Sequence, residues 1–228
     1  MSKKIIFMIA LSLQLFAHDM WTIPSGKDMS YSVVYGHGDK LEPYEVSKVK
    51  EVKAYSANTS TKLETKIENS KVKFTVPQHT VAITVKLDNG IWCQTMDGWK
   101  NVSKKDTKES VLASAHTLKY HKNILSWNKS LLKPLGLPLE IVTLANPLKL
   151  KAGDTFEAIV YKDKKPLSGA KIEIDENGEK QTDENGKIKL KIEKNGFNIF
   201  SISYKTVQKP AIDFDYMLES AILTFNTK

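Results

Sequence analysis

The chain has 228 residues, of which 41% are hydrophobic and 26% are charged, a balance typical of a soluble globular protein rather than a disordered one. Its length allows one large or two small domains. The net charge of +8 comes from lysines spread along alternating, strand-like runs, which favours solvated sheet faces and argues against a nucleic-acid partner. The single cysteine, Cys93, cannot form an internal disulfide and lies among apolar residues, so we expect it to be buried.

Residues 1–17 have the pattern of a secretory signal peptide. A pair of lysines is followed by an apolar run over residues 5–15, and Ala17 is a small residue before the expected cleavage point. The apolar run is shorter than the roughly twenty residues that a membrane-spanning helix needs. We therefore expect an exported protein whose mature chain begins at His18.

Residues 18–130 are expected to form an N-terminal β domain. Alternating and β-branched runs predict strands at 31–35, 49–54, 63–67, 72–76, 81–85 and 91–95. The Asn89-Gly90 pair between the last two predicts a hairpin turn. Residues 108–127 are ambiguous, and we expect an extended strand with a helical start.

Residues 131–138 contain two prolines and a glycine and are expected to connect the domains. Residues 139–228 repeat a rhythm of strand, Asx-Gly turn and strand, with strands predicted at 139–142, 155–161, 171–174, 187–192, 197–204 and 219–225. The acidic turns at 175–178 and 183–186 lack the ligand spacing of a calcium loop, so we interpret them as hairpin turns. The predicted fold class is all-β, with two β-sandwich domains of which the second is immunoglobulin-like.

Three of the five histidines are candidate metal ligands. His18, as the first residue of the mature chain, would offer both its α-amine and its ring nitrogen to one ion. His37 lies between two glycines, which let the backbone bring its ring close to a partner. His116 shares a predicted strand face with two large side chains and is the more inward-facing of the pair that it forms with His121. His79 is interpreted as a surface residue.

A set of an amine and imidazoles suits Ni²⁺ or Cu²⁺, and Zn²⁺ less specifically. Binding should weaken as the pH falls, because the amine must lose its proton and its reference pKa is about 7.7–8.0. No nucleophile elbow, phosphate-binding loop, dinucleotide fingerprint or HExxH motif occurs, so we expect a binding protein and not an enzyme.

Several segments resemble a known family of periplasmic proteins that accompany nickel or cobalt importers, including the NikK type. The resemblance is carried by the following segments: Ala17-His18-Asp19-Met20-Trp21-Thr22-Ile23-Pro24, Gly36-His37-Gly38, residues 135–142 with Asn146-Pro147, residues 165–170 and residues 219–225. It implies a periplasmic protein that binds Ni²⁺, with Co²⁺ or Cu²⁺ as alternatives, and whose partners are the metal ion and the membrane subunits of a nickel-uptake transporter. Of the candidate ligands, His18 and His37 match the family pattern, whereas His116 is added from its position alone.

Two other functions remain open at this stage. One is a copper-handling or oxidative protein with a histidine brace, in which Tyr35 or Tyr120 would be the axial group. The other is a structural or adhesive sandwich protein in which His18 is incidental. Metal binding separates the last from the first two, and metal preference separates those two from each other.

Overall fold

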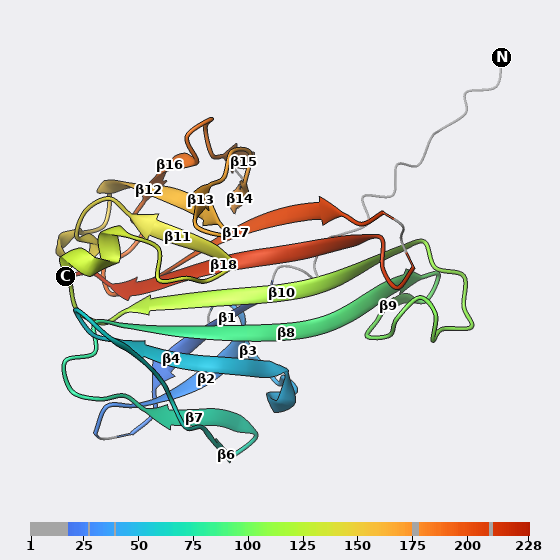
Figure 1. The fold of residues 1–228 in the computed structure, drawn as a ribbon, viewed down its shortest axis with the longest axis horizontal. Coiled ribbons are helices and arrows are strands. Elements are labelled where there is room, and N and C mark those ends of the chain that lie inside the picture. Colours follow the sequence, from blue (N-terminus) through green and yellow to red (C-terminus); the bar gives the residue numbers. More distant parts are fainter. Residues whose placement is uncertain (1–17, 27, 39, 175–177, 210–211) are drawn as a thin grey trace.

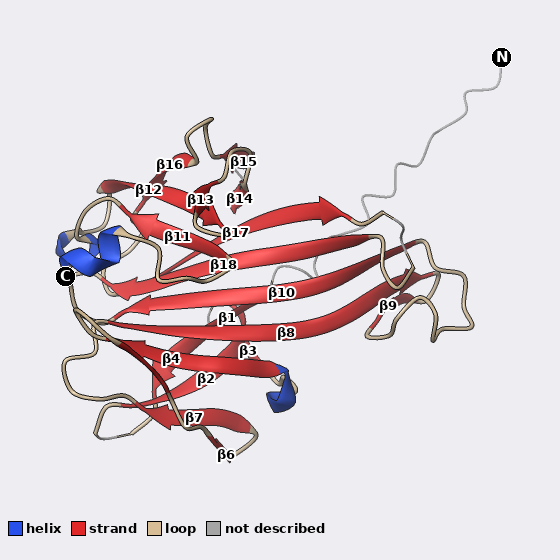
Figure 2. Ribbon diagram, in the orientation of Figure 1, coloured by secondary structure: helices blue, strands red, loops and turns tan. Residues whose placement is uncertain are grey.

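The structure is a computed structural model that describes residues 18–26, 28–38, 40–174, 178–209 and 212–228. The described chain is built from β-strands in three sheets, with three short 3₁₀ helices (Figure 1, Figure 2). The all-β fold class and its β-sandwich character are confirmed. The expected signal peptide, residues 1–17, lies outside the described residues. Within the described part of the chain, no helix has the length and apolar character needed to cross a membrane.

A nine-stranded sheet forms the centre of the molecule, and its long strands run across the middle of Figure 1. In spatial order its strands are β15 (Gly178–Gln181), β14 (Lys171–Ile174), β17 (Phe197–Val207), β18 (Tyr216–Asn226), β10 (Ala113–Ile124), β8 (Ala82–Thr95), β4 (Val49–Tyr55) and β5 (Ser60–Lys62), with β9 (Gly98–Lys100) paired to β8. The central pair, β10 and β18, is parallel, and the other pairings are antiparallel.

A second sheet covers one face of this central sheet. Its strands are β1 (Asp19–Pro24), β2 (Ser30–His37), β7 (Lys71–Thr75) and β6 (Lys66–Glu68), with β3 (Lys40–Glu42) paired to β2 and the 3₁₀ helix η1 (Val46–Lys48) following it. Between the two sheets lies a core of buried apolar side chains, to which both sheets contribute: Met20, Val33, Val72, Phe74, Val52, Ile83, Val85 and Leu87. The alternating pattern of β4 and β7 turns every second residue into this core.

A third sheet covers the opposite face. Its strands are β11 (Leu139–Thr143), β12 (Thr155–Lys162), β13 (Lys165–Pro166) and β16 (Lys187–Lys191), and two 3₁₀ helices, η2 (Lys129–Leu132) and η3 (Pro147–Lys149), flank β11. The core on this side includes Ile141, Val160 and Phe225, but it also includes Tyr120 and Ile124 of β10. Both predicted segments, 18–130 and 139–228, therefore contribute to this core.

Strand β10 separates the two cores and presents one set of side chains to each. On one face, Lys119 lies by the ring of Tyr35, and the Asn123 side chain donates to Thr22 Oγ1 at 3.0 Å. On the other face, Tyr120 packs into the second core and Lys122 bonds to Glu140. Because side chains alternate along a strand, odd-numbered residues of β10 face the second sheet and even-numbered residues face the third.

Two local predictions in the first segment are wrong. Residues 82–95 form one long strand instead of a hairpin, because β10 pairs with both halves of it. Asn89 is the extra residue of a bulge there, since Thr117 pairs with Gly90 and Leu118 with Asp88. The expected helical start at residue 108 is also absent, because residues 108–112 are a loop that leads directly into β10. Cys93 is buried, as expected.

Candidate functional site: a histidine pair at the start of the first strand

The pairing of β1 with β2 brings together two of the predicted ligands. The last pair of this antiparallel register is Asp19 with Gly36, and a continuation of the register by one position would set His18 opposite His37. Directly opposite residues of an antiparallel pair have their side chains on the same face, with Cβ atoms about 4.5–5.5 Å apart. Asp19 also interacts electrostatically with both histidines. The structure therefore gathers His18 and His37 at one end of β1.

The ring of His18 is held by two neighbours from β2 and β3. Its Nε2 atom lies 3.1 Å from Oε2 of Glu42. Its ring stacks on that of Tyr35, with centroids 5.6 Å apart and an interplanar angle of 24°. Tyr35 and Glu42 are themselves paired across β2 and β3. Burial, together with the charges of Asp19 and Glu42, raises the pKa of Tyr35 to about 12, so its hydroxyl stays protonated at neutral pH.

Two residues of opposite charge, the partly exposed Asp19 and the buried Lys119, interact near the histidines. Lys119 of β10 is 4% exposed, and burial lowers its pKa while the charge of Asp19 opposes that shift. Burial raises the pKa of Asp19, and this effect is opposed first by Lys119 and then by a hydrogen bond with Ser201. The Lys119 ammonium also lies 5.9 Å from the centre of the Tyr35 ring. Asp19 thus links the terminal strand to the central sheet.

His116 does not join this pair. It is an even-numbered residue of β10 and so lies on the opposite face of the central sheet from Lys119. There its Nε2 atom lies 2.7 Å from Oδ1 of Asp88, and its ring meets the ring of Phe214 edge-on at 5.4 Å. The structure therefore does not bring His116 together with His18 and His37, because the face of β10 that carries it meets a different core from the one beside the terminus.

The remaining histidines are also separate from the pair. His121 is fully buried, and its Nε2 atom lies 2.8 Å from Thr224 Oγ1. Its Nδ1 atom has no hydrogen-bond partner among the residues that the structure describes, and burial lowers its pKa to about 3. His121 is therefore a neutral histidine of the interior. His79 is exposed in a turn with a φ of 65°.

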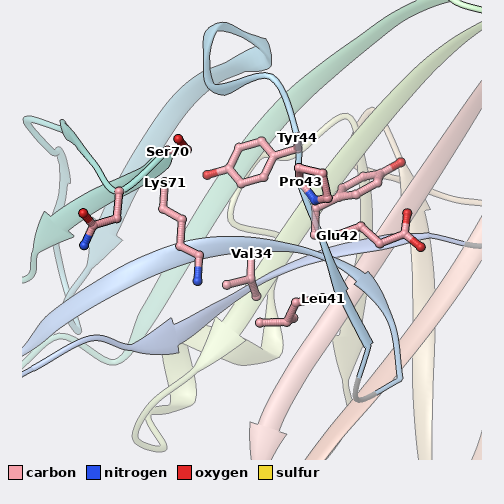
Figure 3. A pocket seen from close by; sticks show the side chains of 9 residues that line it. Val34, Leu41, Glu42, Pro43, Tyr44, Ser70 and Lys71 are labelled. Carbon is pink, nitrogen blue, oxygen red and sulfur yellow. The ribbon is translucent and has the colours of Figure 1, made fainter.

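A cavity of about 270 Å³ adjoins the histidine pair (Figure 3). Tyr35 and Glu42, which contact His18, also line it. Figure 3 shows Lys71 and Glu42 on opposite sides of this cavity, with Val34 and Leu41 between them. Open space therefore adjoins the side of the site where Glu42 lies.

Within the described residues, no group of three or more His, Cys, Asp and Glu side chains is placed to hold a metal ion. The donor set expected from the sequence differs from such a group, because one of its three nitrogens is the main-chain amine of a processed His18. Two histidines at the same end of the β1–β2 pair, with the carboxylate of Glu42 beside one of them, are compatible with that set.

Sequence reasoning missed Glu42 and Lys119. Glu42 belongs to a three-residue strand without an apolar pattern, and Lys119 alternates with apolar residues as a solvated lysine would. The only available signal was Gly36, since a glycine within a strand often marks the close approach of another backbone segment. Here the backbone that approaches is that of β3.

The fold and the site define an all-β protein with packed sheets and a histidine pair at the start of its first described strand. Residues 15–206 match the model of a family described as a domain of unknown function, DUF4198. This match covers most of the chain, and the protein belongs to that family. No curated protein matches the chain significantly.

Proposed function

We propose that the mature protein begins at His18, binds Ni²⁺ in the periplasm and delivers it to an uptake transporter in the membrane. The ligands are the α-amine and imidazole of His18 and the imidazole of His37. The observation that supports this proposal is the β1–β2 register, whose last pair, Asp19 with Gly36, brings His18 and His37 to the same end of β1. Delivery to a transporter rests on the resemblance of the terminal motif to the NikK-type proteins.

The chemistry of these donors favours a late first-row metal. Nitrogen ligands suit Ni²⁺, Co²⁺ and Cu²⁺, and the affinity order places copper highest. Binding requires the neutral amine, so it should weaken as the pH falls below the reference pKa of about 7.7–8.0. The carboxylates of Asp19 and Glu42 offset part of the positive charge that the ion brings to this end of β1.

A copper-handling protein with a histidine brace is the second candidate. It is favoured by the stacking of Tyr35 on His18, which places a phenol beside the proposed chelate. Tyr120, the other tyrosine considered for this role, lies on the opposite face of the central sheet and bonds to Glu219. Of the two tyrosines, only Tyr35 is therefore proposed for it.

Calorimetric titration of Ni²⁺, Co²⁺ and Cu²⁺ into protein with a confirmed His18 terminus tests the proposal. We expect one ion to bind per chain, and we expect an added residue before His18 to abolish tight binding while the fold remains. His37→Ala should have the same effect, and His79→Ala should have none. Copper binding with Tyr35-dependent spectra and no nickel binding would favour the second candidate. If none of the three ions bound, the remaining alternative would be a structural or adhesive sandwich protein that binds no metal.

A further inference from the structure

The position of Glu42 bears on which ring nitrogen of His18 is available to a metal ion. Glu42 approaches Nε2 of the ring, at 3.1 Å. The α-amine of the same residue reaches only the other ring nitrogen, since a chelate between them closes through Cα, Cβ and Cγ to Nδ1. The carboxylate therefore occupies the nitrogen that the chelate leaves unused.

We infer that Glu42 is a positioning residue, which holds the proton of His18 on Nε2 and leaves the lone pair of Nδ1 free for the metal ion. This inference rests on the proposed function. A carboxylate that accepts a hydrogen bond from the non-coordinating nitrogen fixes the tautomer and the orientation of a ligand histidine, and it makes the ring more basic. In this structure Oε2 of Glu42 lies 3.1 Å from Nε2 of His18, within reach of such a hydrogen bond.

The pairing of β3 with β2 holds Glu42 beside the ring of His18. Glu42 pairs with Tyr35 across β3 and β2, and Tyr35 stacks on the His18 ring. The ring is thus confined on its face by Tyr35 and at its edge by Glu42. Gly36 lets β3 approach this closely, because a Cβ atom there would collide with the Lys40 carbonyl oxygen.

Two variants test whether Glu42 positions the proton of His18 or only contributes to the stability of the fold. Glu42→Gln keeps an acceptor oxygen without the charge, and Glu42→Ala removes the acceptor. Glu45→Ala is the matched control, since Glu45 is an exposed carboxylate nearby that bonds to Ser47 and not to a histidine. All are prepared with His18 as the first residue, and chemical denaturation checks that each is folded.

The first measurement is the tautomer of His18 in metal-free protein, by nitrogen-15 NMR at a pH of about 9, well above the reference imidazole pKa of about 6.5. We expect the Nε2–H form in the wild type, the Glu45→Ala control and Glu42→Gln. Glu42→Ala should show a mixture of the two tautomers. An unchanged tautomer in Glu42→Ala would overturn the inference.

The second measurement is Ni²⁺ affinity. Loss of such a partner typically weakens metal binding 10–100-fold, so we expect Glu42→Ala to bind about tenfold more weakly, Glu42→Gln to bind with an intermediate affinity and the control to match the wild type. If Glu42→Gln lost binding completely with its tautomer intact, Glu42 would be a ligand and the inference would be wrong. If the wild type bound no metal, the proposed function would fail, while the NMR result would still decide whether Glu42 sets the tautomer.

Discussion

Lys122 and Glu140 form an ion pair of 2.8 Å in which both side chains are almost completely buried, at 2% and 0% exposure. Lys122 comes from β10, and Glu140 comes from β11 of the third sheet. The Glu140 carboxylate also accepts hydrogen bonds from the backbone N–H groups of the connecting segment, at Leu135, Gly136 and Leu137. One carboxylate therefore fixes the connection between the two segments against the central sheet.

Glu140→Gln should be strongly destabilising. It leaves the buried Lys122 ammonium without its counter-charge, and breaking a buried pair from one side typically costs about 3–5 kcal/mol. The double variant Lys122→Met/Glu140→Gln should lose less stability than Glu140→Gln alone, because no buried charge remains. Urea denaturation of the wild type, Glu140→Gln, Lys122→Met and the double variant measures the coupling. Equal losses in the single and double variants would contradict this account.

The electrostatic interaction between Asp19 and the buried Lys119 should influence metal binding. Asp19→Asn removes the negative charge that faces Lys119, so whatever positive charge Lys119 keeps against its burial is uncompensated near the proposed site, and we expect Ni²⁺ binding to weaken by up to about tenfold. Adding Lys119→Met to Asp19→Asn should restore the affinity, since the net charge of the pair is again zero. Calorimetry on the two variants checks this. A double variant as weak as Asp19→Asn would show that Asp19 acts directly and not through Lys119.

His121 should make the protein sensitive to acid. Its pKa is about 3 in the folded state, against about 6.5 for an exposed histidine. Below about pH 6.5 the unfolded chain therefore takes up a proton that the folded chain refuses, and stability falls by up to about 1.4 kcal/mol per pH unit until about pH 3. Above pH 6.5 this contribution is constant.

His121→Gln should have a smaller loss of stability between pH 6.5 and 4 than the wild type, as measured by urea denaturation at each pH. His79→Asn is the matched control, because His79 is exposed and asparagine tolerates its positive φ. Its pH profile should follow that of the wild type. An unchanged slope in His121→Gln would mean that other groups cause the acid sensitivity.

Local patterns predicted most of the longer strands but not how they pair, and they missed β1 and misplaced the strand expected at 63–67. The alternation in residues 49–54 and 155–161 is a property of the segment itself, and both became strands β4 and β12. The pairing of β10 with β18 joins residues about a hundred positions apart, and no local pattern shows it. The pairing of β10 with β8 explains the wrong hairpin, since Asn89-Gly90 fits a bulge as well as a turn when a long partner strand is present.

The candidate site was predictable only where its residues belong to a contiguous motif. His18 and His37 could be found from the terminal sequence and from the glycines that flank His37. His116 was misplaced because alternation shows that two residues share a face but not which core that face meets. Glu42 and Lys119 reach the site through β3 and β10, so their roles depend on the packing of two sheets.

Gly36→Ala should disturb the site through the backbone. A Cβ atom at this position would collide with the carbonyl oxygen of Lys40, so β3 must move away from β2. Overpacking of this kind typically costs about 1–3 kcal/mol. The displacement should also withdraw Glu42 from His18, and so it should weaken Ni²⁺ binding and release the His18 tautomer as Glu42→Ala does.

Gly38→Asn is the matched control for this change. Gly38 lies in the same motif, but a Cβ atom there meets nothing within 4 Å, and asparagine tolerates its φ of 57°. We expect this control to retain the stability, the His18 tautomer and the nickel affinity of the wild type. If Gly36→Ala instead retained the stability, the tautomer and the affinity of the wild type, the close approach of β3 to β2 would not require a glycine at position 36. The proximity of Glu42 to His18 would then need another cause.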